Sequence, residues 1–283
     1  GAAGRGSGLR FGPAGIILML IVLIQGKIDF NPIKKQWVGL LLMALTGIFG
    51  YNMFFFFGLE LTSAINGSLI MATSPVFITL GAVLFFKENW NRQIGFGLLL
   101  SLIGVTVVIS GGSLDTLMQL TFNMGDLLFL GGLLCWVAHG LLGRQVMKDV
   151  SPLATTAIST VIGAVMAGLA SLFEQGWGDV TVMSTQAWGE MGFMIICSSV
   201  VAFFLWNQGI QQIGASQCSI YMNLVPISTA LIAILLYGST ITFVQIFGMM
   251  LVIIGVYFVT LHPYLKKRNK THKWREVQLW NQK

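Results

Sequence analysis

The chain has 283 residues, of which 55% are apolar and only 9% are charged, and its formal net charge is +6. Soluble domains usually carry about 25% charged residues, so this composition excludes an ordinary soluble domain and indicates an integral membrane protein. The positive charge does not indicate a nucleic-acid partner, because most of it falls in the loops and the tail between apolar segments.

Nine segments are apolar and long enough, or nearly so, to cross the hydrocarbon core of a bilayer, which takes about 20 residues. Each is continuously apolar, without the alternation of a β-barrel strand, so we expect helices. The predicted helices cover residues 9–25, 37–57, 63–86, 92–111, 125–145, 152–173, 188–208, 216–237 and 243–261. The first of these is the shortest and the weakest.

One stretch of the chain occurs twice. Residues 58–108 align with residues 209–259 at a constant offset of 151, without a gap and with 15 of 51 positions identical. The identical pairs include Gly97 and Gly248, Gly104 and Gly255, and Pro75 and Pro226. Glycine and proline set backbone shape rather than hydrophobicity, so shared composition alone does not explain these matches. We interpret them as an internal repeat.

The basic residues lie mainly on one side of the predicted helices. With a cytoplasmic tail, 14 of the 16 basic residues fall inside: Lys27, Lys34, Lys35, Lys87, Arg92, Arg144, Lys148 and seven residues between Lys266 and Lys283. Arg5 and Arg10 fall outside, and the outer loops carry acids but no lysine: Glu60, Asp115, Glu174 and Asp179. This bias predicts a cytoplasmic C-terminus. It leaves no charged residue at midmembrane, so the sequence does not indicate ion coupling.

The repeat and the topology together predict an inverted architecture. Corresponding helices of the two copies are five spans apart, so the copies face opposite ways across the membrane, as in many secondary transporters. The helix at 125–145 has no partner in the first copy, so we expect that one N-terminal helix is missing and that the full protein has ten. The predicted parts are a first repeat over 9–113, an outer linker over 114–124, a second repeat over 125–262 and a basic cytoplasmic tail over 263–283.

Several stretches resemble a known family. They are RFGPAG at 10–15, TSAINGSLIMATSPVFITLGAVLFFKE at 62–88, GDLLFLGGLLCWVAHGLLGRQV at 125–146 and IFGMMLVIIGVYFV at 246–259. In these stretches the chain is similar to EamA-type transporters of the drug/metabolite transporter superfamily. The resemblance implies an all-α bundle of 5+5 inverted transmembrane helices with both ends cytoplasmic. It also implies export or exchange of small metabolites across a bacterial inner (plasma) membrane.

Polar and aromatic side chains within the apolar segments are candidates for a substrate cavity, because polar groups in hydrocarbon are costly. The candidates are Tyr51, Asn52, Trp136, His139, Trp206, Asn207, Tyr221 and Asn223. The alternative is that each of them bonds a neighbouring helix and serves packing. His139 is the only histidine within a span, so it is a candidate for proton coupling or an ordinary packed residue. Pro75 and Pro226 free backbone carbonyls and are candidate hinges, or simple bends.

The remaining reactive residues indicate neither catalysis nor a cofactor. Cys135, Cys197 and Cys218 lack the spacing of a disulfide framework or a metal site, and Asp126 and Glu190 read as solvated acids at helix starts. We therefore expect no metal, no cofactor and no enzyme. The predicted function is alternating-access transport of amino-acid-like or amphipathic compounds. The predicted partners are a small-molecule substrate, membrane lipid and a second copy of the chain in a homodimer, without nucleic acid.

Two alternatives remain open from the sequence. A membrane-embedded enzyme acting on lipid-linked substrates would need convergent acids, a serine–base pair or metal ligands within the membrane. A non-transporting scaffold would be favoured by a closed, apolar interior. A lining of polar and aromatic side chains favours a carrier over both.

Overall fold

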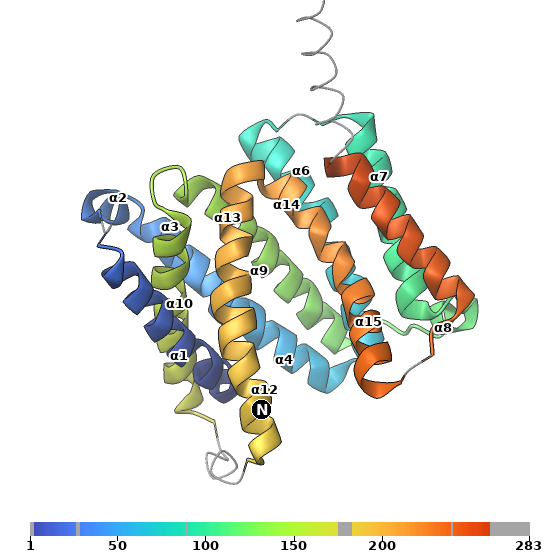
Figure 1. The fold of residues 1–283 in the computed structure, drawn as a ribbon, viewed down its shortest axis with the longest axis horizontal. Coiled ribbons are helices and arrows are strands. Elements are labelled where there is room, and N and C mark those ends of the chain that lie inside the picture. Colours follow the sequence, from blue (N-terminus) through green and yellow to red (C-terminus); the bar gives the residue numbers. More distant parts are fainter. Residues whose placement is uncertain (1–2, 27–28, 89, 175–182, 239, 261–283) are drawn as a thin grey trace, which may run out of the picture. The chain divides into compact units, whose positions relative to one another are not determined.

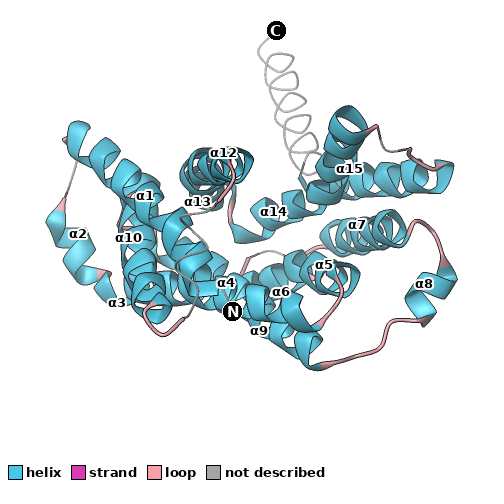
Figure 2. Cartoon of the chain, turned by 90° about the horizontal axis from the view of Figure 1, so that it is seen from below, coloured by secondary structure: helices cyan, strands magenta, loops and turns pink. Residues whose placement is uncertain are grey.

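The computed structural model describes residues 3–26, 29–88, 90–174, 183–238 and 240–260 (Figure 1). Lys27, Asp179 and the predicted tail over 263–283 lie outside the described residues. In the part that is described, every regular element is a helix and no strand occurs (Figure 2). The predicted all-α fold class is confirmed.

Within those ranges, nine helical spans are long and apolar enough to cross a membrane. They are Gly4–Ile24, Trp37–Leu61, Ala64–Phe86, Arg92–Ser110, Met124–Val146, Pro152–Ser171, Thr185–Ile213, Ala215–Leu236 and Phe243–Thr260. Each overlaps one predicted segment, so the prediction of a multi-pass helical membrane protein is confirmed.

The helical elements follow one another with short connections. The first half contains α1 (Ala3–Ile24), α2 (Phe30–Lys35), α3 (Trp37–Met43), η1 (Ala44–Gly50), α4 (Tyr51–Leu61), α5 (Ala64–Ala72), α6 (Ser74–Phe86), α7 (Arg92–Ser110) and α8 (Leu114–Met118). The second half contains α9 (Met124–Val146), α10 (Pro152–Ser171), α12 (Thr185–Phe193), η2 (Met194–Ala202), α13 (Phe203–Ile213), α14 (Ala215–Ser219), η3 (Ile220–Leu224) and α15 (Val225–Tyr237). A last helix covers Phe243–Thr260.

Helix α1 departs from the sequence prediction. It begins at Ala3 rather than at residue 9, so the helical span Gly4–Ile24 includes both Arg5 and Arg10. The physical reason is a contact across the sequence. The carboxylate of Glu174 accepts hydrogen bonds from the backbone N–H groups of Gly4 and Arg5 at 2.7 and 2.9 Å. A carboxylate at these otherwise unpaired N–H groups extends the helix toward the N-terminus.

The helix boundaries follow the sequence repeat. The elements η1 and η2 are both π-helical, and the offset of 151 maps η1 onto residues 195–201, inside η2. The same offset maps α6 onto the bounds of α15, residue for residue. Both copies therefore keep the same local backbone irregularity. Such π-helical segments are rare and often lie at functional sites.

The described helices belong to two compact units, and each unit takes segments from both predicted repeats. The first unit comprises Gly1–Ala82 and Thr121–Cys218. Within it α1 packs along α10 (Figures 1 and 2), while α9 contacts α3, η1, α4, α5 and α13. Its core is apolar, and fully buried side chains such as Phe11, Leu18 and Phe129 fill the space between these helices.

The second unit comprises Val83–Leu120 and Ser219–Lys283. Helix α7 crosses the last helix at glycines, because a Cβ on Gly97 would lie 2.6 Å from the Gly255 carbonyl oxygen. A Cβ on Gly104 would lie 2.6 Å from the Gly248 carbonyl oxygen. Small residues of this kind let membrane helices approach closely. The offset of 151 relates Gly97 to Gly248 and Gly104 to Gly255. Each contact therefore joins the first glycine of one copy to the second glycine of the other, which is the exchange that a two-fold axis produces.

Candidate functional site

A cluster of aromatic rings lies where α4, α9 and α13 meet in the first unit. Trp136 of α9 is its centre and is only 8% exposed. Its ring centroid lies 5.3 Å from Tyr51, 5.4 Å from Trp206 and 5.9 Å from Phe203. Trp136 also stacks on His139 at 5.6 Å, as expected for residues three apart on one helix face. We call these five residues the aromatic cluster.

His139 is held in the aromatic cluster by the π-helical segment η1. Its Nδ1 atom lies 3.1 Å from the backbone oxygen of Met43, which directly precedes η1. Because a carbonyl can only accept, Nδ1 carries the proton and Nε2 is left as an acceptor. The ring fits because residue 47 is glycine, where a Cβ would collide with it. Among the described residues, the buried Nε2 atom has no hydrogen-bond partner.

Trp206 and Asn207 add two more buried polar atoms beside the rings. The side chain of Asn207 is fully buried and donates from Nδ2 to the hydroxyl of Thr156 on α10 at 2.8 Å. In the described part of the chain, Asn207 Oδ1 and Trp206 Nε1 lack hydrogen-bond partners. A buried polar atom left without a partner costs about 1–3 kcal/mol. These atoms are one donor, Trp206 Nε1, and two acceptors, Asn207 Oδ1 and His139 Nε2.

Arg10 lies next to this cluster, and sequence reasoning missed it. Its Nε and Nη2 atoms donate to the hydroxyls of Ser199 and Ser198 at 2.7 and 2.8 Å. The neighbouring Phe11 ring packs edge-on against Phe203 at 5.8 Å. The sequence held a signal, because RFGPAG at 10–15 continues directly into an apolar run.

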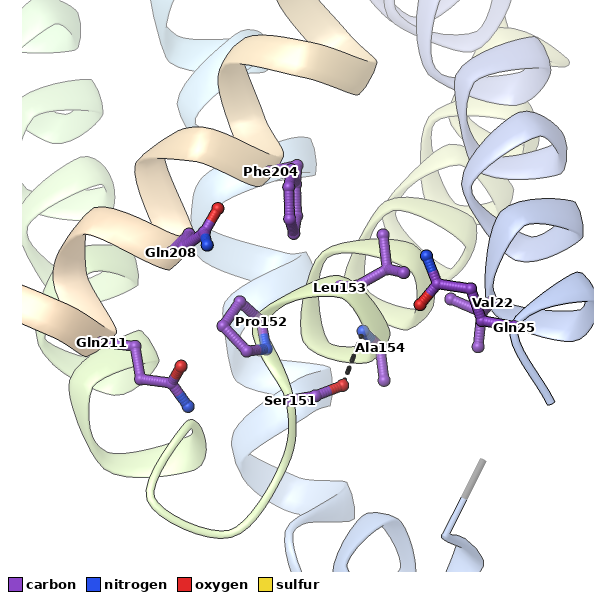
Figure 3. A pocket seen from close by; sticks show the side chains of 9 residues that line it. All are labelled: Val22, Gln25, Ser151, Pro152, Leu153, Ala154, Phe204, Gln208 and Gln211. Atoms are coloured by element: carbon purple, nitrogen blue, oxygen red, sulfur yellow. Dashed lines mark hydrogen bonds between the residues drawn. The ribbon is translucent and has the colours of Figure 1, made fainter. Parts of the chain in front are cut away.

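The first unit also contains an open pocket of about 270 Å³ at one end of α10 (Figure 3). Its walls are Val22, Gln25, Ser151, Pro152, Leu153, Ala154, Phe204, Gln208 and Gln211. Ser151 is the N-cap of α10 and accepts from the backbone N–H of Ala154 at 3.3 Å. Three glutamine amides make this pocket more polar than the aromatic cluster, and it contains none of the predicted site residues.

Comparison with known proteins identifies the family. The model of the EamA-like transporter family matches residues 5–110 and 123–261. The chain belongs to the EamA-like transporter family. It is 38% identical to "Uncharacterized transporter YyaM" of Bacillus subtilis (strain 168) over 247 residues, which are 87% of this chain and 81% of that protein.

One further relative agrees with this assignment, and one solved structure supports the fold. One is "Uncharacterized inner membrane transporter YedA" of Escherichia coli (strain K12), 24% identical over 92% of this chain and 82% of that protein. The other is a protein of known crystal structure that is 18% identical, with a TM-score of 0.76 over 92% of this chain and 88% of its own. The structural likeness supports the fold alone. The names of the relatives indicate a membrane transporter.

The other predicted site residues of this EamA-family protein do not join the cluster. Asn52 is 3% exposed, but its Nδ2 donates to the Ile48 carbonyl of its own helix at 2.7 Å. Tyr221 and Asn223 belong to the second unit, where Asn223 donates to the Ser101 hydroxyl at 2.7 Å and Tyr221 is 41% exposed. The structure therefore brings together Tyr51, Trp136, His139 and Trp206, with Asn207 beside them.

The two candidate hinges lie at helix interruptions. Pro75 follows a break at Thr73 between α5 and α6, and Pro226 is in the first turn of α15, directly after the 3-10 turn η3. Proline is favoured in the first turn of a helix, where its missing N–H costs nothing. Each proline therefore restarts a helix rather than bending a continuous one. A hinge at these positions stays a prediction.

Asp126 corrects a further expectation for this EamA-family chain. It lies in the first turn of α9, as predicted, but it is 2% exposed rather than solvated. Its carboxylate accepts from Thr62 Oγ1 at 2.7 Å and from the backbone N–H of Asn123 at 2.9 Å. The carboxylate thus completes a capping box and ties α9 to the end of α4. In the described ranges, no three His, Cys, Asp or Glu side chains are grouped to hold a metal ion.

Proposed function

We propose that this EamA-family protein moves small amphipathic or amino-acid-like compounds across a bacterial inner membrane by alternating access, as an exporter or exchanger. The aromatic cluster binds the cargo. The observation that carries this proposal is that three of the buried polar atoms without partners in the described chain belong to the predicted site residues His139, Trp206 and Asn207. Ligand sites typically combine apolar and aromatic walls with a few polar groups that fix orientation.

The contacts between the repeats support alternating access. The offset of 151 relates α1 to α10 and η1 to η2, and α1 contacts η2 while α10 contacts η1. The same exchange occurs between α7 and the last helix, where Gly97 contacts Gly255 and Gly104 contacts Gly248. Reciprocal contacts of this kind are expected of inverted repeats, in which one set of helices moves against the other. The family matches at 5–110 and 123–261 also begin and end near the predicted repeats over 9–113 and 125–262.

The direction of insertion rests on charge and on one relative. The positive-inside bias of the loops favours a cytoplasmic C-terminus. The printed name of the Escherichia coli relative describes an inner membrane transporter. Both support an inner-membrane carrier whose tail faces the cytoplasm.

Uptake of a panel of amphipathic metabolites into vesicles that contain the purified chain tests this function. We expect transport of at least one compound, and we expect Trp136→Ala to reduce its rate at least about tenfold, because aromatic anchors contribute several kcal/mol at binding sites. Trp188→Ala is the matched control, since Trp188 lies in the first turn of α12 and is 46% exposed. The control should transport at the wild-type rate.

Two outcomes would contradict the proposal. A folded chain that transports nothing on the panel, with or without an imposed gradient, favours the scaffold. Equal losses in Trp136→Ala and Trp188→Ala show that the aromatic cluster is not the cargo site. The pocket of Figure 3 is then tested by Gln208→Ala, which we otherwise expect to leave transport unchanged.

A further inference from the structure

Arg10 is a charged residue in the interior of a membrane span, and its partners are neutral. Its guanidinium donates to two serine hydroxyls, and it makes no ion pair among the described residues. Hydroxyl dipoles solvate a cation but do not neutralise it. Charged side chains in membrane spans are costly and usually pair with an opposite charge or mark a substrate path.

The hydrogen-bond partners of this group lie at the middle of a long helical span. Ser199 lies 14 residues from each end of the helical span Thr185–Ile213. At 1.5 Å per residue, each end of the helix is about 20 Å away. Arginine can reach the membrane surface by extending its side chain, but here Ser198 and Ser199 hold the guanidinium at the middle of their helix.

Among the described residues, no acid forms an ion pair with Arg10. The elements with the most extensive contacts to α1 are α10, η2, α4 and η1, and of these only α4 contains an acid, Glu60, near its end. Helix α13, which meets α1 where Phe203 packs on Phe11, contains no acid. The other arginine of α1 shows what a paired cation looks like in this helix. Arg5 Nε lies 3.8 Å from Glu174 Oε2, so Glu174 already has its partner.

The surroundings of Arg10 have the composition of a site for an anion with an aromatic or aliphatic body. The guanidinium stacks over the Phe11 ring at 4.7 Å, and Phe11 contacts Phe203 of the aromatic cluster. A cation and aromatic rings therefore occur together in the first unit.

We propose that Arg10 binds the carboxylate of the transported compound, with Ser198 and Ser199 orienting the guanidinium and the aromatic cluster receiving the apolar body. This inference rests on the proposed transport function and narrows its cargo to amphipathic carboxylates. Arginine suits the role because its planar fork matches a carboxylate and because it keeps its charge when buried. No covalent step is involved.

The test compares an acid with its uncharged amide. Binding of phenylacetate and of phenylacetamide to the purified chain in an uncharged detergent is followed by tryptophan fluorescence. We expect wild type to bind phenylacetate about 10- to 100-fold more tightly, the range for a charge-assisted pair. Arg10→Met should remove this preference, and Arg10→Lys should keep part of it. Arg5→Gln is the control, and it should lower the thermal midpoint while keeping the preference.

The remaining outcomes test either the carboxylate site at Arg10 or the transport function itself. If Arg10→Met does not fold, the Ser198→Ala/Ser199→Ala double variant replaces it, and an unchanged preference there overturns the inference. Wild type that binds and transports both probes equally, with loss in Trp136→Ala, overturns the carboxylate site but leaves the transport function standing. Transport of nothing on the metabolite panel overturns the function itself.

A separate arm distinguishes cargo from lipid. Binding of phenylacetate is repeated in phosphatidylcholine vesicles with and without phosphatidylglycerol. Unchanged binding supports a cargo carboxylate at Arg10. Competition by phosphatidylglycerol that disappears in Arg10→Met assigns the anion to a lipid phosphate and overturns the cargo assignment.

Discussion

The two π-helical segments η1 and η2 have the same place in the two halves of the chain but different chemistry. Against η1, α10 packs so closely that a Cβ on Gly163 would collide with Ile48. Against η2, α1 brings Arg10 to the hydroxyls of Ser198 and Ser199. The offset of 151 relates Arg10 to Val161, Ser199 to Ile48 and Gly12 to Gly163.

This difference separates what the repeat preserves from what it leaves free to change. Backbone geometry is preserved, because both copies keep a π-helical segment at the same position. Polarity is not preserved, since one copy buries Ile48 completely and the other buries the hydroxyl of Ser199. A binding site for one cargo needs an asymmetric set of groups, so we expect function to reside where the copies differ.

The largest loss of stability is expected when an arginine is placed in the second copy, at the position that corresponds to Arg10. Val161→Arg would introduce a guanidinium in α10, where a Cβ on Gly15 of α1 would lie 3.1 Å from the Val161 side chain. The positions that the offset relates to Ser198 and Ser199 are Gly47 and Ile48, which offer no hydroxyl. An arginine at the centre of a membrane helix costs about 2.5–3.5 kcal/mol, so the variant should unfold at a much lower temperature. The reciprocal Arg10→Val is the control and should remain folded. Thermal unfolding in detergent, read by tryptophan fluorescence, measures both. Equal stability of the two variants would contradict the view that only the first copy accommodates an arginine at this position.

A smaller loss of stability is expected from alanine substitution of Gly163 and Gly12, which the offset of 151 relates. Gly163→Ala adds a methyl group against Ile48, and overpacking of this kind costs about 1–3 kcal/mol. Gly12→Ala adds the same methyl where nothing lies within 4 Å, so its stability should change by less than about 0.5 kcal/mol. Denaturation of the two variants side by side makes the comparison. A loss of stability at Gly12 as large as at Gly163 would show that α1 is packed as tightly as α10.

The fold could be predicted from sequence because a bilayer imposes simple rules. Nine apolar runs of sufficient length give nine spans within the described residues, and an aligned repeat gives related helix boundaries. The start of α1 could not be predicted, because it depends on Glu174, which lies about 170 residues away in the chain. Local composition at residues 3–8, with its glycines and its arginine, favours a disordered start over a helix.

The candidate site could be predicted only in part. The pairing of Trp136 with His139 follows from helical spacing, while the approach of Tyr51 and Trp206 to them is a matter of packing between helices. Asn52 could not be separated from the others by sequence, since bonding to its own helix depends on the π-helical carbonyl of Ile48. Arg10 was missed because counting charges by loop gives no weight to a basic residue inside the first predicted span.

The smallest effect is expected from a single hydroxyl beside the charge. Ser199→Ala removes one of two serine acceptors from Arg10, and hydrogen bonds between membrane helices contribute about 0.6 kcal/mol on average, at most about 1.7. Thr46→Val in η1 is the control, since Thr46 bonds the Leu42 carbonyl of its own helix at 2.7 Å. In double-mutant cycles with Arg10→Met, Ser199→Ala should show coupling and Thr46→Val none. Coupling of both with Arg10 would mean that the charge acts through the whole bundle, whereas coupling of Ser199 alone restricts its effect to the contact between α1 and η2.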